Sequence, residues 1–144
     1  MRNIRINRRF LLFVLVSCVS VTAACAGALV KPTSDTLVQS AREYWEARSK
    51  GDWTKAYSFE LHQSEESLAQ YSGRLAAAYG RLPLEFLSVS DPVVEEATGK
   101  GKVEVLLKLQ FKYPARGNIK QKVNDKWQFK DGKWYHDARP EEEH

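Results

Sequence analysis

Apolar side chains recur at helical spacing in the first part of the chain that follows residue 33. The positions on this stripe are Leu37, Val38, Ala41, Tyr44, Trp45 and Arg48. Ser34 or Asp35 can cap the first free N–H groups, and Gly51 is a residue type that commonly ends a helix. The pattern therefore predicts a helix that begins at Ser34 or Asp35 and ends before Gly51.

Two further helices are predicted by the same signals. Asp52 can cap a short helix over residues 53–57, and Ser64 can open a longer one that closes at Gly80. The residues that share one face of the longer helix are Leu68, Tyr71, Leu75, Ala76 and Tyr79. We therefore expect three helices before any strand.

From Leu82 onward the apolar period changes to two, which indicates strands with one buried face. The clearest strand covers residues 102–113, where the odd positions are apolar and the even positions, Leu106 excepted, are polar. A second strand covers residues 119–130. Its expected buried positions are Ile119, Val123, Trp127 and Phe129.

A two-residue type I′ turn at Asp131-Gly132 joins this strand to a last one over residues 133–137. Counting outward from the turn, the facing pairs are Phe129 with Trp134 and Trp127 with His136. Helices followed by an antiparallel meander with one apolar face predict an α+β domain, with the helices packed in the concavity of the sheet.

The N-terminus has the pattern of an export signal. Residues 1–9 are basic and contain no acidic side chain, and residues 10–21 are an apolar run too short to span a bilayer comfortably. The sequence Thr22-Ala-Ala-Cys25 resembles a bacterial lipobox, which predicts that Cys25 is lipidated and becomes the mature N-terminus. The chain would then be anchored to the membrane through acyl chains.

Two alternatives for this segment remain open. The lipobox usually has Leu three residues before the cysteine, and Leu15 in front of Cys18 fits that rule better than Thr22 does, although it leaves a cramped apolar region. Cleavage after Ala26 or Ala28 by ordinary signal peptidase would instead release a secreted protein.

These signals divide the chain into four parts. We expect a lipoprotein signal peptide over residues 1–24, a tether over 25–33, one globular domain over 34–140 and an acidic tail over 141–144. The predicted location is the cell envelope, on a membrane and facing the periplasm or the exterior, with secretion as the alternative.

The net charge of +4 does not indicate a nucleic-acid-binding protein. Four of the 22 basic residues are arginines in the signal peptide, so the remainder carries 18 basic and 18 acidic side chains. Lysines gather on the even-numbered sheet face at positions 102, 108, 112, 120, 122, 126 and 130. They keep the outer sheet solvated and its edges unpaired, or contact anionic lipid or envelope polymers.

Two segments resemble a known family. Residues 41–57 (AREYWEARSKGDWTKAY) are similar to the opening of NTF2-like domains, and residues 127–136 (WQFKDGKWYH) are similar to their closing hairpin. The resemblance implies a cone-shaped, cystatin-like α+β domain with a pocket between the first helices and the concave sheet face. The superfamily includes transport factors, isomerases and dehydratases, so it does not specify a function.

The pocket implied by this resemblance directs attention to aromatic side chains and to one histidine. Its predicted lining residues are Tyr44, Trp45, Trp53, Tyr57, Trp127, Trp134 and His136. At helical and strand spacing such aromatics can equally be ordinary core residues. The leading prediction is a non-catalytic envelope lipoprotein that binds an apolar small molecule or an envelope protein.

The alternative is an isomerase or dehydratase in which His136 and Asp125 carry protons at the pocket mouth. The competing interpretation of that pair is two hydrogen-bonded or solvated residues at the pocket rim. His62 lies near Glu60, Glu65 and Glu66, but no metal-ligand spacing is present, so we predict no metal. We also predict no cofactor, because the sequence contains no phosphate-binding glycine loop.

Overall fold

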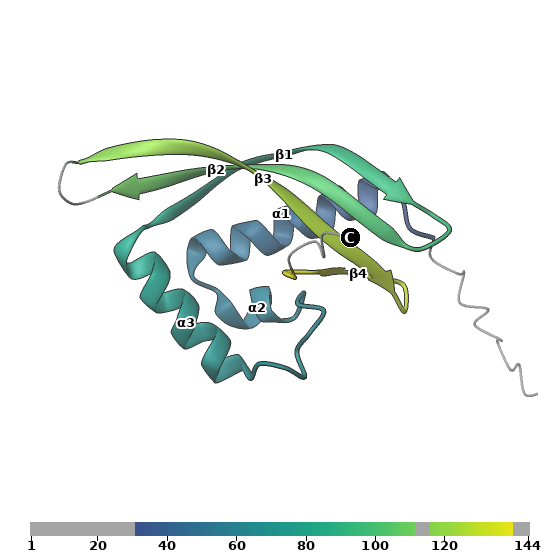
Figure 1. Cartoon of the computed structure of the whole chain (residues 1–144), viewed down its shortest axis with the longest axis horizontal. Coiled ribbons are helices and arrows are strands. Elements are labelled where there is room, and N and C mark those ends of the chain that lie inside the picture. The colour runs from purple at the N-terminus through teal and green to yellow at the C-terminus, as the bar shows by residue number, and fades with distance from the viewer. Residues whose placement is uncertain (1–30, 112–115, 140–144) are drawn as a thin grey trace, which may run out of the picture.

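The computed structural model describes residues 31–111 and 116–139. The predicted signal peptide, Cys18, Cys25 and the acidic tail lie outside these residues. The elements are α1 (Ser34–Lys50), α2 (Trp53–Tyr57), α3 (Leu68–Arg81), β1 (Leu84–Glu95), β2 (Lys100–Phe111), β3 (Gly117–Lys130) and β4 (Lys133–His136). The strands form one antiparallel sheet in the order β1-β2-β3-β4, and the helices lie on its concave side (Figure 1). The predicted α+β class is confirmed.

Helix α1 ends as the sequence predicts but is capped one residue earlier. The cap is Thr33, whose extended backbone lets its hydroxyl accept from the Thr36 N–H while the Thr36 hydroxyl accepts from the Thr33 N–H. Ser34 already has helical geometry, so neither it nor Asp35 is the cap. Gly51 adopts the left-handed conformation (φ 74°) and its N–H closes the last turn.

Helix α3 differs from the prediction at both ends. It begins at Leu68 with Ser67 as its cap, because the Tyr57 hydroxyl lies 2.8 Å from the carbonyl oxygen of Gln63 and 2.6 Å from that of Glu66 and holds the preceding residues in turns. Gly80 lies inside the helix, since its φ is not positive and nothing forces the chain to leave the helical path before Arg81.

The sheet register agrees with the sequence. Trp127 pairs with His136 and Phe129 with Trp134, and the turn residues Asp131 and Gly132 have φ of 52° and 79°. The prediction for Ile119 is wrong, because its side chain is 54% exposed. Figure 1 shows the reason: the far ends of β2 and β3 extend beyond the helices, so none of the described helices covers them.

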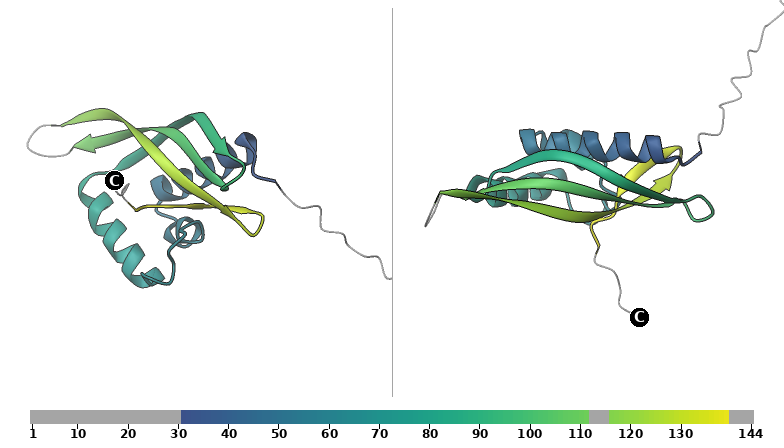
Figure 2. Two further views of the ribbon diagram at one scale, coloured as in Figure 1. Left: turned by 45° about the vertical axis from the view of Figure 1, so that its right-hand side comes forward. Right: turned by 90° about the horizontal axis from the view of Figure 1, so that it is seen from above.

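The core lies between α1 and the concave face of β2, β3 and β4 (Figure 2). Its fully buried large side chains are Leu37, Tyr44, Val105, Trp127 and Trp134. Gly101 on β2 allows this close packing, since a Cβ there would lie 2.8 Å from atoms of both Leu37 and Trp134.

Among residues 31–111 and 116–139, no helix is long and apolar enough to cross a bilayer.

Candidate functional site

His136, Glu60 and Asp125 form a buried polar cluster on the concave side of the sheet. The register of β3 and β4 places His136 opposite Trp127 and therefore beside Asp125, which lies on the same face two residues earlier. His136 Nε2 is 2.9 Å from Asp125 Oδ1, and Nδ1 is 3.0 Å from Glu60 Oε2. The side chains of His136 and Asp125 thus meet as the alternative prediction requires.

Glu60 reaches the cluster through backbone pairing. The segment after α2 runs parallel to β4, with the Leu61 N–H donating to the His136 carbonyl at 3.0 Å and the His136 N–H donating to the Phe59 carbonyl at 2.7 Å. This pairing fixes the position of Glu60 directly beside the imidazole.

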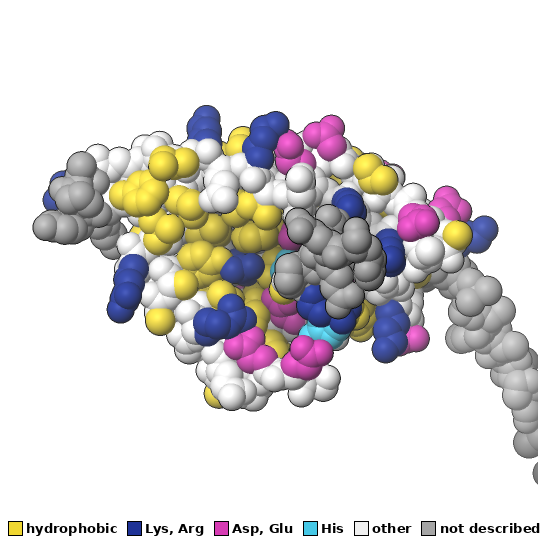
Figure 3. Space-filling view, in the orientation of Figure 1, with side chains coloured by type: hydrophobic (Ala, Val, Ile, Leu, Met, Phe, Trp, Pro, Cys, Tyr) yellow, Lys and Arg dark blue, Asp and Glu magenta, His cyan; other side chains and the backbone are white. Residues whose placement is uncertain are grey.

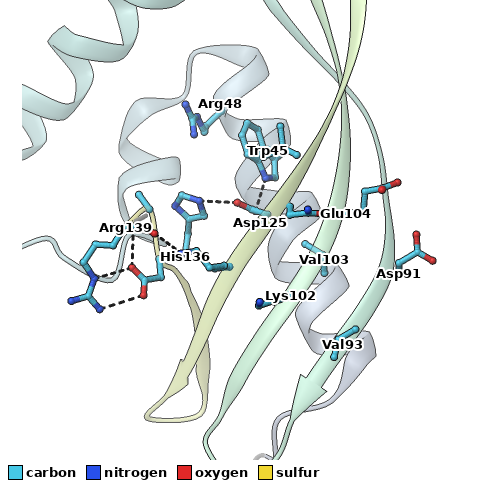
Figure 4. A pocket seen from close by; sticks show the side chains of 15 residues that line it. Trp45, Arg48, Asp91, Val93, Lys102, Val103, Glu104, Asp125, His136 and Arg139 are labelled. Atoms are coloured by element: carbon cyan, nitrogen blue, oxygen red, sulfur yellow. Dashed lines mark hydrogen bonds and ion pairs between the residues drawn. The ribbon is translucent and has the colours of Figure 1, made fainter. Parts of the chain in front are cut away.

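Asp125 accepts two more hydrogen bonds from indole groups. Trp45 Nε1 donates to its Oδ2 at 2.8 Å (Figure 4), and Trp127 Nε1 donates to the same oxygen at 2.9 Å. The carboxylate is only 4% exposed, so its negative charge is stabilised by three N–H groups rather than by water.

The two carboxylates determine the protonation of His136. Burial by itself would lower the pKa of this imidazole, but the hydrogen bonds and charges of Asp125 and Glu60 raise the pKa to about 9. Burial acts to raise the pKa of Glu60, and the hydrogen bond and positive charge of His136 outweigh it, so that pKa is lowered. At neutral pH the cluster therefore holds an imidazolium that donates from both ring nitrogens.

Tyr44 extends the cluster toward Arg48. The Tyr44 ring stacks on the imidazole at 4.4 Å, and its hydroxyl donates to Glu60 Oε1 at 2.7 Å. Arg48 Nη1 donates to that hydroxyl at 2.9 Å, and Nη2 donates to the Tyr79 hydroxyl. Positive and negative groups thus alternate from Arg48 through Glu60 and His136 to Asp125.

Two hollows open beside this cluster. The larger hollow has a volume of about 770 Å³, and its wall includes Trp45, Arg48, Val103, Val123, His136 and Arg139 (Figure 4). The smaller hollow has a volume of about 300 Å³, and its wall includes Tyr44, Arg48, Tyr57, Glu60, Tyr71 and His136. In Figure 3 apolar side chains gather below the sheet, and charged side chains surround them on the side away from the sheet. Arg48 and His136 belong to both walls.

The structure brings together four of the seven side chains predicted to line a pocket. These four are Tyr44, Trp45, Trp127 and His136, and their rings contact one another with one exception. The exception is the pair Trp45 and Trp127, which both donate a hydrogen bond to Asp125. Of the other three, Tyr57 contacts Tyr71 and lines the smaller hollow, whereas Trp53 stacks on Tyr79 and Trp134 packs on Phe129 outside both hollows. Trp127 and Trp134 are 2% and 1% exposed and lie in the core.

Sequence reasoning did not single out Arg48, Glu60 or Tyr71 for this site. Arg48 had a signal, because it is a charged residue on an otherwise apolar helical stripe. Glu60 had none, since its position depends on pairing with a strand 76 residues away. His62 lies 3.2 Å from Glu65 and 3.4 Å from Asp137, and among the described residues no group of side chains is arranged to hold a metal ion.

The helices and curved antiparallel sheet, with a polar cluster and hollows on the concave side, define a cone-shaped α+β domain. No protein-family model and no curated protein matches the sequence. The structure is similar to a candidate dehydratase of the NTF2-like family from Streptomyces avermitilis, with a TM-score of 0.51 and 12% identity over 72% of this chain and 93% of that one. It is also similar to the protein Aln2 from another Streptomyces strain, with a TM-score of 0.50 and 10% identity over 71% and 83%. The fold is thus the NTF2-like fold that the sequence motifs predict.

Proposed function

We infer that this chain is a non-catalytic ligand-binding domain displayed by a cell-envelope lipoprotein. The observation that carries this proposal is the hydrogen bonding of His136, which is complete at both ring nitrogens while two hollows remain open beside it. The cluster serves to shape and rigidify the walls of those hollows.

Proton transfer by His136 and Asp125 is the rival proposal, and the geometry disfavours it. A general base must accept a proton near neutral pH, whereas His136 is already protonated there and has a pKa raised to about 9. Asp125 is 4% exposed, and its oxygens accept from one imidazole and two indoles. A substrate in either hollow would have to displace one of these hydrogen bonds before it exchanged a proton with His136 or Asp125.

The hollows suit a small molecule with both apolar and polar parts. Trp45, Val103 and Val123 supply apolar surface to the larger hollow, and Arg48 supplies a cation to both. The predicted anchor at Cys25 would hold this domain at the membrane, where such a molecule or an envelope protein could be captured.

Mass spectrometry of the full-length protein from its own membranes tests this proposal. We expect the denatured mass to match a chain acylated at Cys25, and the native mass to exceed it by that of one bound small molecule. A co-purifying protein would favour partner binding in place of small-molecule binding. An unmodified chain beginning at Gly27 or Leu29, with no added native mass, would contradict both the anchor and the bound ligand.

A further inference from the structure

We propose that the ligand of this domain is an anion, of the carboxylate class, whose charged group is recognised by Arg48 in the smaller hollow. This inference rests on the proposed ligand-binding function and adds the chemical class of the ligand and the residue that selects it.

Arg48 is the cationic end of the buried polar cluster. The opposite end, Asp125, is closed by the indole N–H groups of Trp45 and Trp127. Arg48 instead meets only neutral hydroxyls, those of Tyr44 and Tyr79, and among the described residues no carboxylate lies within ion-pair distance of it. The row of alternating charges thus ends in a cation at the wall of both hollows.

Aromatic rings hold the Arg48 guanidinium in place. Its central carbon lies 4.6 Å from the ring centre of Trp45, 5.2 Å from that of Tyr79 and 5.4 Å from that of Tyr44. These contacts and its two hydrogen bonds position the planar group before a ligand arrives, which lowers the entropy lost on binding. A guanidinium matches a carboxylate because its N–H groups form a planar fork.

Two polar atoms near this end have unused donor capacity. A guanidinium has five N–H bonds, and the buried Nε–H of Arg48 has no hydrogen-bond partner among the described residues. Tyr71 is 2% exposed, and its hydroxyl lies near Tyr44 and Glu60. This hydroxyl likewise has no hydrogen-bond partner among the described residues. Both residues line the smaller hollow, and an acceptor-rich anion is the ligand that would use them.

The other arginines of the smaller hollow are already neutralised. Arg74 makes two hydrogen bonds to Glu66, at 2.9 and 2.7 Å, and Arg139 pairs with Asp137 at 3.1 Å. Arg48 is therefore the residue by which this hollow distinguishes an anion from a neutral molecule of the same shape.

Benzoate and benzamide test this inference, because they have nearly the same shape and only benzoate is charged. Full-chain protein in a non-ionic detergent is titrated with each compound, and the ¹⁵N–¹H signal of Arg48 Nε is followed by NMR. We expect benzoate to shift this signal saturably and to bind at least about tenfold more tightly than benzamide. Arg48→Met should abolish the preference, whereas Arg42→Gln, which removes an exposed cation of the same helix that lines neither hollow, should retain it.

The outcomes separate the two proposals. Equal binding of benzoate and benzamide to the wild-type chain would overturn the anion inference and leave ligand binding intact, and this comparison requires no variant. An unchanged preference in a folded Arg48→Met protein would also overturn it, with circular dichroism reporting whether the variant folds. If neither compound shifts any signal and the native mass shows no bound molecule, the binding function fails and the inference fails with it.

Discussion

Asp125 carries a buried charge that is stabilised only because every neighbour is present. Its carboxylate accepts from an imidazolium and two indoles, and these donors come from α1, β3 and β4. Removing one member of such a cluster leaves an uncompensated charge or an unpaired donor away from water, which is costlier than losing an exposed ion pair.

The substitution Asp125→Asn tests this dependence. It keeps the shape of the side chain and removes the charge that faces His136, so we expect the free energy of unfolding to fall by about 2–4 kcal/mol. Urea denaturation measures the change. Asp131→Asn is the matched control, because Asp131 lies in an exposed turn with φ of 52°, and we expect a change within about 0.5 kcal/mol. Similar effects of the two substitutions would contradict the role given to Asp125.

His136 should make stability fall on the alkaline side of neutrality. Its pKa is raised in the folded state to about 9 from an ordinary value near 6.5, so its stabilising contribution is complete below pH 6.5 and is lost as pH rises to 9. A shift of this size corresponds to about 3–4 kcal/mol. Glu60, with its lowered pKa, contributes in the opposite sense, because its stabilisation is lost as pH falls below about 4.5.

Stability measured from pH 4 to pH 9.5 should therefore be highest between about pH 5 and 6.5. The imidazole NMR signal of His136 should titrate near pH 9. A flat profile from pH 6.5 to 9, together with a His136 titration near 6.5, would show that the imidazolium is not held by the two carboxylates.

At the scale of elements, Gly101 sets how closely β2 approaches α1 and β4. A Cβ at this position would lie 2.8 Å from Leu37 Cδ2 and 2.8 Å from Trp134 Cζ3, and both of these side chains are fully buried. The separation between helix and sheet is thus determined by the absence of a side chain.

Gly101→Ala should lower the free energy of unfolding by about 1–3 kcal/mol, because the added methyl group must displace packed core atoms. Gly73→Ala is the control. Gly73 lies inside α3 with nothing within 4 Å of its would-be Cβ, so the same change should raise stability by up to about 1 kcal/mol. Thermal unfolding of both variants measures the difference, and equal shifts in one direction would refute the steric explanation.

The sequence predicts most of the fold because its signals are local. Alternation along β2, the Asp131-Gly132 turn and Gly51 after α1 each determine nearby backbone geometry, and the turn places His136 opposite Trp127. The start of α3 depends on contacts of the Tyr57 hydroxyl with carbonyl groups six and nine residues away, and the exposure of Ile119 depends on how far the helices extend along the sheet. Neither follows from the spacing of apolar residues.

The candidate site was predictable only in part for the same reason. Asp125 and His136 meet through hairpin register, which can be counted from the turn. Glu60 meets His136 through a parallel bridge, and Arg48 meets Tyr79 from another helix, so neither contact follows from spacing.

At the scale of the whole molecule, the two faces of the sheet differ in character. The concave face is apolar, and the outer face carries lysines. On the outer face some lysines are neutralised across the sheet, as Lys108 is by Glu85 and Lys122 by Glu104. Binding is confined to the concave side in our proposal, and membrane attachment is assigned to the chain before the domain.

Cysteine variants test the proposed attachment. We expect Cys25→Ser to move the full-length protein from the membrane fraction to the soluble fraction, because it removes the acceptor of the acyl chains. Cys18→Ser should leave it in the membrane fraction. Fractionation with immunoblotting measures both, and release by Cys18→Ser alone would assign lipidation to Cys18 instead.

The buried row from Arg48 to Asp125 also constrains how this domain can change during evolution. Because a lone replacement of His136 by an apolar residue would leave two carboxylates facing each other without a cation, intermediates with one substitution would be strongly counter-selected. Descendants of a common ancestor should therefore retain Glu60, Asp125 and His136 together or have exchanged all three together. Correlated replacement at these three positions among related sequences would indicate that the cluster is inherited as one unit.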